Sequence, residues 1–170
     1  MKKTLKDWIL ATRPWSLPAS TMSVVTSAMY MWWVCNCSGS HFNWLNAVLA
    51  LLGMAFFQLG GNLTSDWHDF VSGVDKPGEE SVQILTSGQF SKKEVSIYAA
   101  AMLAVGVGIG LVIFARTGMP TLYIGIAGFL LAVFYYFLKY NALGDMCILF
   151  EYALLPMLGT CYVTSGAIHW

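Results

Sequence analysis

Three oxygen-bearing side chains lie where a long apolar stretch of the sequence meets a polar one. Asn62, Asp66 and Asp69 follow the apolar run 44–61, and Asp75 comes shortly after them. Asn62 precedes Asp66 by one helical turn and Asp69 follows it by three residues, so on a continuing helix all three share one face. Hard divalent cations such as Mg²⁺ accept oxygen ligands, and they hold diphosphates in turn. The spacing predicts a metal–diphosphate site in which Asn62, Asp66 and Asp69 bind the metal.

Further polar residues on either side of this trio favour the same interpretation. Gln58 and Asn62 lie on the apolar stretch itself, where amide side chains are costly unless they find partners. Gly73 permits a turn that can bring Asp75 back towards the two aspartates. The alternative is an ordinary solvated loop, in which acidic residues are common.

The composition is that of a membrane protein. Apolar residues make up 57% of the chain and charged residues only 11%, too few to cover the outside of a soluble helical bundle. Five apolar stretches have the length of a bilayer span. They are Ser16–Cys35, Trp44–Asn62, Val95–Ala115, Pro120–Leu138 and Met146–Ile168. We predict an all-α fold, an integral membrane bundle of about five transmembrane helices forming a single domain over residues 1–170.

Basic residues lie almost entirely on one side of these predicted spans. Eight of the nine precede the first span or lie in the connections after the second and fourth spans, and only Arg116 lies on the other side. The eight are Lys2, Lys3, Lys6, Arg13, Lys76, Lys92, Lys93 and Lys139. The bias predicts a multi-pass protein of the inner (cytoplasmic) membrane with a cytoplasmic N-terminus. No basic stripe interleaved with aromatic residues occurs in a soluble region, so we expect no nucleic-acid partner.

The residues around Asp66 resemble a known motif. The pattern Gln58-x-x-x-Asn62-Leu-x-x-Asp66-x-x-Asp69-Phe-x-x-Gly73-x-Asp75, followed by Thr86-Ser87-Gly88, is similar to the first aspartate motif of the UbiA superfamily of intramembrane aromatic prenyltransferases. Two other segments, 11–19 and 143–166, resemble the branch that prenylates 1,4-dihydroxy-2-naphthoate in menaquinone biosynthesis. The resemblance therefore extends over most of the chain.

This resemblance implies a reaction and a set of site residues. The expected enzyme is a Mg²⁺-dependent prenyltransferase that transfers a polyprenyl group from a polyprenyl diphosphate to an aromatic acceptor within membrane lipid. Asp66 and Asp69 would be its catalytic residues and, with Asn62, its metal ligands. The residues expected to bind substrate are Asn62, Gln58, Asp75, Arg13 and Lys139.

The sequence also departs from the family pattern. Ser65 and Gln83 stand where the branch usually has Asn and Arg, and the second aspartate motif of the family's enzymes, which have about eight or nine spans, is missing. We expect the chain to be the N-terminal portion of such an enzyme and to be inactive alone. A short protein completed by a second chain is the other possibility.

A function of a different class also fits some of these residues. Glu151 is an acidic residue inside the fifth predicted span, where ionisable groups are rare and often functional. With the aspartates it could line an ion path in a non-catalytic membrane subunit or transporter fragment. Ion flux without affinity for a prenyl diphosphate would distinguish this alternative.

Overall fold

The structure is a computed structural model that describes residues 3–74, 84–141 and 143–167. All regular elements within these residues are helical, as predicted, and no strand occurs among them. The helices are α1 (Leu5–Ala11), α2 (Pro18–Ser38), α3 (Trp44–Val71), α4 (Lys92–Thr117), α5 (Met119–Tyr140), α6 (Gly144–Ile148) and α7 (Leu155–Ser165). A 3₁₀ turn, Pro14–Ser16, separates α1 from α2, and a π-helical segment, Leu149–Leu154, joins α6 to α7.

The N-terminal helix α1 is a short, capped segment that packs beside the start of α4. The Thr4 side chain accepts a hydrogen bond from the Asp7 backbone N–H, and the Asp7 carboxylate accepts one from the Thr4 N–H, which forms a capping box. Trp8 packs edge-on against the rings of Phe90 and Tyr98. These contacts hold α1 and the turn after it close to α3 and α4.

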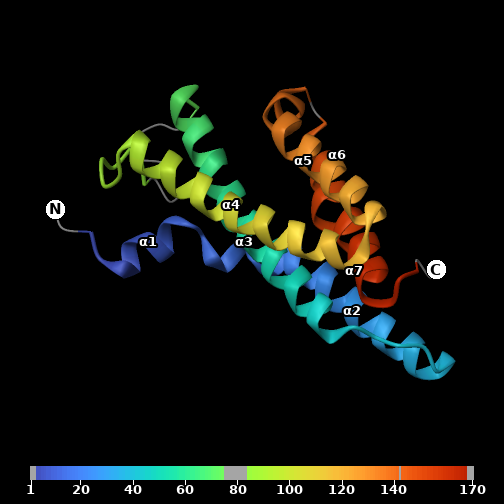
Figure 1. Cartoon of the computed structure of the whole chain (residues 1–170). Coiled ribbons are helices and arrows are strands. Elements are labelled where there is room, and N and C mark those ends of the chain that lie inside the picture. Colours follow the sequence, from blue (N-terminus) through green and yellow to red (C-terminus); the bar gives the residue numbers. More distant parts are fainter. Residues whose placement is uncertain (1–2, 75–83, 142, 168–170) are drawn as a thin grey trace.

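Helices α3 and α4 form the most extensive helix pair of the fold, and Figure 1 shows them side by side. Glycines allow their close approach: a Cβ on Gly60 would lie 2.8 Å from the Leu103 side chain, and one on Gly106 would lie 3.1 Å from Phe57. Residue numbers rise along α3 as they fall along the facing stretch of α4, so the two helices are antiparallel. Small residues at such contacts are typical of helices that pack within a membrane.

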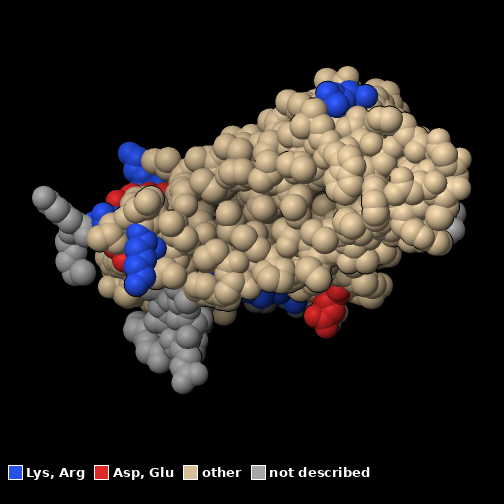
Figure 2. All heavy atoms as spheres, turned by 90° about the horizontal axis from the view of Figure 1, so that it is seen from below, with Lys and Arg blue, Asp and Glu red and all other residues tan. Residues whose placement is uncertain are grey.

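Among the residues that the structure describes, three helical stretches are long and apolar enough to cross a membrane: Trp44–Val71, Lys92–Thr117 and Gly144–Ser165. A shorter apolar stretch, Met119–Ala132, belongs to α5, and the first predicted span corresponds to the 21-residue helix α2. Each predicted span therefore overlaps a helical part of the described residues, and three of these parts meet the length and hydropathy expected of a span. Figure 2 shows the broad middle of one face without charged side chains.

Helix α3 differs most from its predicted extent. The predicted span ends at Asn62, whereas the helix continues without a break to Val71. The fall in hydropathy after Gly61 marks where the chain becomes polar, and a helix can continue beyond that point because its backbone hydrogen bonds do not depend on the membrane. Asp66 and Asp69 consequently lie on a helix rather than in a loop.

Candidate metal and diphosphate site

Helix α3 presents Asn62, Asp66 and Asp69 on one face. Their spacing of four and three residues places them in successive turns of an uninterrupted helix. This face points into the protein, because the three side chains contact the segment before α2 and the end of α5. Asp66 is only 4% exposed. The carboxylates are therefore held in defined positions and not spread through solvent.

Asp66 forms an ion pair with Arg13, the residue directly before the 3₁₀ turn. The distance between Arg13 Nη2 and Asp66 Oδ1 is 2.5 Å. Arg13 has a φ of 53° and is the single non-glycine residue with positive φ in the described part of the chain. This left-handed conformation is unfavourable for a side chain with a Cβ, so the surrounding contacts must hold it in place. The turn directs the guanidinium towards α3.

Asp69 forms an ion pair with Lys139, in the last turn of α5. Lys139 Nζ lies 3.1 Å from both carboxylate oxygens of Asp69. Ser65, one turn earlier on α3, has its hydroxyl 3.5 Å from Asp69 Oδ2. A cation thus lies beside each of the two aspartates, one from the N-terminal segment and one from α5.

Asn62 and Gln58 connect α3 to the segment before α2. The Asn62 amide nitrogen donates hydrogen bonds to the Thr12 carbonyl and the Ser16 hydroxyl, both at 2.8 Å. Gln58 is 4% exposed, and its amide nitrogen lies 3.3 Å from Asn62 Oδ1. These bonds give the two amide nitrogens the partners that polar groups on an apolar helix require, while the buried Gln58 Oε1 has no hydrogen-bond partner among the described residues.

The structure brings most of the predicted site residues together. Gln58, Asn62, Asp66, Asp69, Arg13 and Lys139 form one connected region. Asp75 lies outside the described residues, as do Glu79, Glu80 and Gln83. Thr12 and Ser16 were not predicted as site residues. The available signal was the pair of prolines, Pro14 and Pro18, which predicts a break in the helix opposite the polar face of α3.

The donors on this face fit a hard divalent cation bound together with a diphosphate. Mg²⁺ is commonly held by one or two carboxylates plus water and phosphate oxygens, and Asp66 and Asp69 supply two carboxylates. Within the described residues no group of three or more His, Cys, Asp or Glu side chains converges on one point. Asn62 Oδ1 already accepts from Gln58, so Asn62 would have to exchange that bond to act as a ligand. The residues fit a shared metal–diphosphate site better than an all-protein cage.

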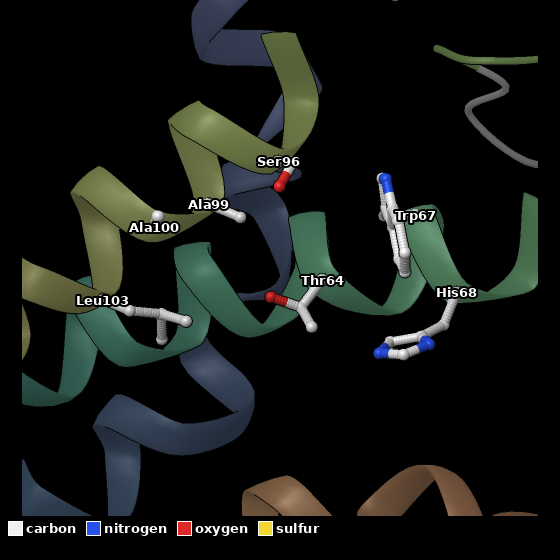
Figure 3. Close-up of a pocket in the computed structure, with 7 residues that line it drawn as sticks. All are labelled: Thr64, Trp67, His68, Ser96, Ala99, Ala100 and Leu103. Carbon is white, nitrogen blue, oxygen red and sulfur yellow. The ribbon is translucent and has the colours of Figure 1, made fainter. Parts of the chain in front are cut away.

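A separate pocket of about 260 Å³ lies between α3 and α4. Thr64, Trp67 and His68 line it from α3, and Ser96 and Leu103 are among its α4 residues (Figure 3). Helical periodicity places Thr64, Trp67 and His68 on the side of α3 away from Asn62, Asp66 and Asp69. This pocket is therefore not part of the aspartate site.

Comparison with known proteins decides the family. Residues 14–170 match the UbiA prenyltransferase family, a region that includes every site residue described above except Thr12 and Arg13. The chain belongs to the UbiA prenyltransferase family. It is a membrane protein with several apolar helices, from an enzyme family.

Relatives of this UbiA-family chain include proteins named as prenyltransferases. It is 26% identical to a 1,4-dihydroxy-2-naphthoate octaprenyltransferase of Escherichia coli (strain K12), covering 95% of this chain and 54% of the relative. It is 30% identical to the protein of the same name in Haemophilus influenzae, over 99% of this chain and 57% of the relative. It is also 26% identical to a Drosophila melanogaster UbiA prenyltransferase domain-containing protein 1 homolog, over 98% of this chain and 47% of the relative. The chain spans about half the length of the curated relatives it matches. No solved structure matches it.

Proposed function

We propose that this UbiA-family chain forms the diphosphate-binding part of an enzyme that transfers a polyprenyl group from a polyprenyl diphosphate to an aromatic acceptor. The acceptor we propose is 1,4-dihydroxy-2-naphthoate, for menaquinone biosynthesis, because two relatives are named for that substrate. The observation that carries the proposal is the pairing of two aspartates on one face of α3 with two cations, Arg13 and Lys139. Carboxylates that bind a metal beside cations that contact phosphate are the components such a reaction needs.

In the proposed reaction the allylic C–O bond of the prenyl donor breaks, and its electron pair leaves with the diphosphate. Bound Mg²⁺ would supply positive charge that stabilises this leaving group. Asp66 and Asp69 would hold the metal, with Asn62 and Asp75 in support. Arg13 and Lys139 would contact the diphosphate or an anionic acceptor with charge-assisted hydrogen bonds. An acceptor ring carbon then forms the new bond, and in the naphthoate reaction the acceptor's carboxylate leaves as carbon dioxide.

The two ion pairs suit a change of partners when the proposed metal binds. Arg13 and Lys139 neutralise Asp66 and Asp69 when no metal is bound, which limits the cost of burying Asp66. A metal bound to the same carboxylates would take over this role, and both cations would then be available to the diphosphate. We place the site at the cytoplasmic face of the inner membrane, following the distribution of the basic residues.

The test is the Asp66→Asn variant in a reconstituted full-length bundle supplied with Mg²⁺, a polyprenyl diphosphate and the naphthoate acceptor. We expect product formation to be abolished, because an amide removes the negative charge that binds the metal. Asp7→Asn is the matched control, since Asp7 lies on α1, where its carboxylate takes part in capping that helix. Unchanged turnover by Asp66→Asn would refute the proposal. Ion flux through the chain in liposomes, without affinity for the prenyl diphosphate, would favour a transporter instead.

A further inference from the structure

Besides the pocket between α3 and α4, a cavity with a polar lining lies at the end of the fold away from the aspartates. It has a volume of about 330 Å³ and is lined by residues of the α2–α3 connection and α3, the end of α4, and the end of α7. Its polar lining includes His41, Asn46, Arg116, Thr117 and Tyr162. No Asp or Glu is among the described residues that line it. Its described lining therefore includes a basic side chain and no carboxylate, whereas the aspartate site contains both.

Arg116 is held in this cavity by a buried amide. Arg116 Nε donates a hydrogen bond of 2.7 Å to Asn46 Oδ1, and Asn46 is 3% exposed. The Asn46 amide nitrogen is fixed in turn by a 2.6 Å bond to the Val163 carbonyl on α7. Since this arrangement uses only Nε, the two terminal amino groups of the guanidinium keep their N–H donors for another partner.

No acidic residue in the described parts of the chain forms an ion pair with Arg116. The ion pairs within the described parts of the chain are Lys3–Glu94, Arg13–Asp66 and Lys139–Asp69, none of which includes it. The walls around it are braced by the Tyr162 hydroxyl, which donates a 3.0 Å bond to the Thr117 carbonyl and so links α7 to α4. An exposed guanidinium oriented by a fixed amide, in a braced polar cavity, suits a planar two-point contact with an oxyanion.

The position of the cavity indicates where that oxyanion comes from. Asn46 and Asp66 lie twenty residues apart on the same helix, a separation of about 30 Å along its axis. This is about the thickness of the hydrocarbon core of a bilayer, so a helix that crosses it would place the two ends at opposite interfaces. We propose that Arg116 and its cavity bind a phosphate group, carried by a phospholipid of the leaflet opposite the aspartate site.

Binding of lipids that differ only in the phosphate tests this proposal. The full chain, purified in an uncharged detergent, would be titrated with phosphatidic acid and with diacylglycerol of the same acyl chains, and bound lipid counted by native mass spectrometry. We expect phosphatidic acid to be retained preferentially and Arg116→Gln to weaken its binding about tenfold, the loss of one charge-assisted contact. Arg116→Lys should restore part of the affinity, because it keeps the charge and loses the two-point geometry.

Controls separate this site from general attraction between charges. Lys6→Gln removes one positive charge from the exposed surface of α1 and should leave phosphatidic acid binding unchanged. Inorganic phosphate added as competitor distinguishes the sources: displacement of the lipid at millimolar phosphate would assign the cavity to a soluble anion, and no displacement would assign it to the lipid. Equal binding by the wild type and Arg116→Gln, or equal loss in Lys6→Gln, would overturn the proposal. Neither measurement requires Mg²⁺ or a prenyl diphosphate, so the result is independent of the proposed enzymatic function.

Discussion

Arg13 and Asp66 lie fifty-three residues apart in the sequence and form a 2.5 Å ion pair at the core of the candidate site. Arg13 reaches Asp66 from a left-handed backbone conformation, directly before Pro14. Asp66 is buried on α3, so its charge depends on partners inside the protein. The pair thus couples an unfavourable backbone turn to the neutralisation of a buried carboxylate.

Replacing Arg13 by Gln should destabilise the chain by roughly 3 kcal/mol, the low end of the cost of removing one partner from a buried ion pair. The low end applies because the Arg13 side chain is about a third exposed, at 31%. The measurement is thermal or denaturant unfolding of the purified chain in an uncharged detergent. A loss below 0.5 kcal/mol, as measured for many surface pairs, would show that Asp66 does not rely on Arg13.

Two companion variants separate the charge from the backbone. Arg13→Gly also loses the ion pair but tolerates a positive φ, so it should be more stable than Arg13→Gln by about 1 kcal/mol. The double variant Arg13→Gln/Asp66→Asn should recover part of the stability lost in Arg13→Gln, because the buried charge is then gone. Additive losses in the double variant would argue against direct coupling.

Periodicity within one helix could be predicted from the sequence, and contacts between distant segments could not. The spacing of Asn62, Asp66 and Asp69 was sufficient to place them on one face, because α3 continues through all three. The partners of the aspartates, Arg13 and Lys139, were predicted only as residues that bind substrate. Their contacts with α3 depend on how α5 packs and on the conformation of a single turn, neither of which hydropathy encodes.

The end of α3 could not be predicted from hydropathy either. Hydropathy locates the boundary between apolar and polar environments, and that boundary lies near Asn62, whereas the helix ends at Val71. The predicted first span, Ser16–Cys35, begins two residues before α2 and ends three residues before its last residue, whereas the helix begins at Pro18 and is capped by Gly39 in a left-handed conformation. Proline and glycine therefore mark the ends of α2 more closely than the limits of the apolar stretch do.

Asn62 should not tolerate replacement by Asp, although Asp is the better metal ligand. The amide nitrogen of Asn62 donates to the Thr12 carbonyl and the Ser16 hydroxyl, and a carboxylate cannot donate to that carbonyl. We expect Asn62→Asp to lower the free energy of unfolding by about 2 kcal/mol, because the Thr12 carbonyl loses its donor and faces a carboxylate, whereas the Ser16 hydroxyl can turn to donate to that carboxylate. Unfolding in detergent without Mg²⁺ measures this directly. Stability equal to the wild type would mean that the bond to the Thr12 carbonyl contributes little.

Gly60 and Gly61 are adjacent on α3 but should respond in opposite ways to replacement by Ala. A Cβ on Gly60 would lie 2.8 Å from the Leu103 side chain and 3.2 Å from its backbone nitrogen, whereas one on Gly61 meets nothing within 4 Å. Gly60→Ala should destabilise the chain by about 1–3 kcal/mol through overpacking between α3 and α4. Gly61→Ala should be neutral or stabilise it by up to about 1 kcal/mol through helix propensity. Similar effects of the two variants would contradict the close approach of these helices.

Replacing Lys139 by Met should have opposite effects on metal and on diphosphate. Lys139 lies 3.1 Å from both oxygens of Asp69, so it competes with a metal for that carboxylate and becomes available to a diphosphate once the metal has bound. Without it, Mg²⁺ alone should bind several-fold more tightly, while a prenyl diphosphate in saturating Mg²⁺ should bind about tenfold more weakly, as expected for loss of one charge-assisted contact. Calorimetric titration of the full-length bundle measures both affinities.

The stability of the Lys139→Met variant makes these affinities interpretable. About a third of the Lys139 side chain is exposed, at 35%, and partly exposed ion pairs contribute at most about 1 kcal/mol, so the variant should remain folded. Lys93→Met, an exposed position near the start of α4, controls for the loss of one positive charge and should change neither affinity. If Lys139 only anchored α5 to α3, its removal would disturb the position of Asp69 and weaken both ligands together. Opposite signs for the two ligands are therefore the result that assigns Lys139 to the diphosphate.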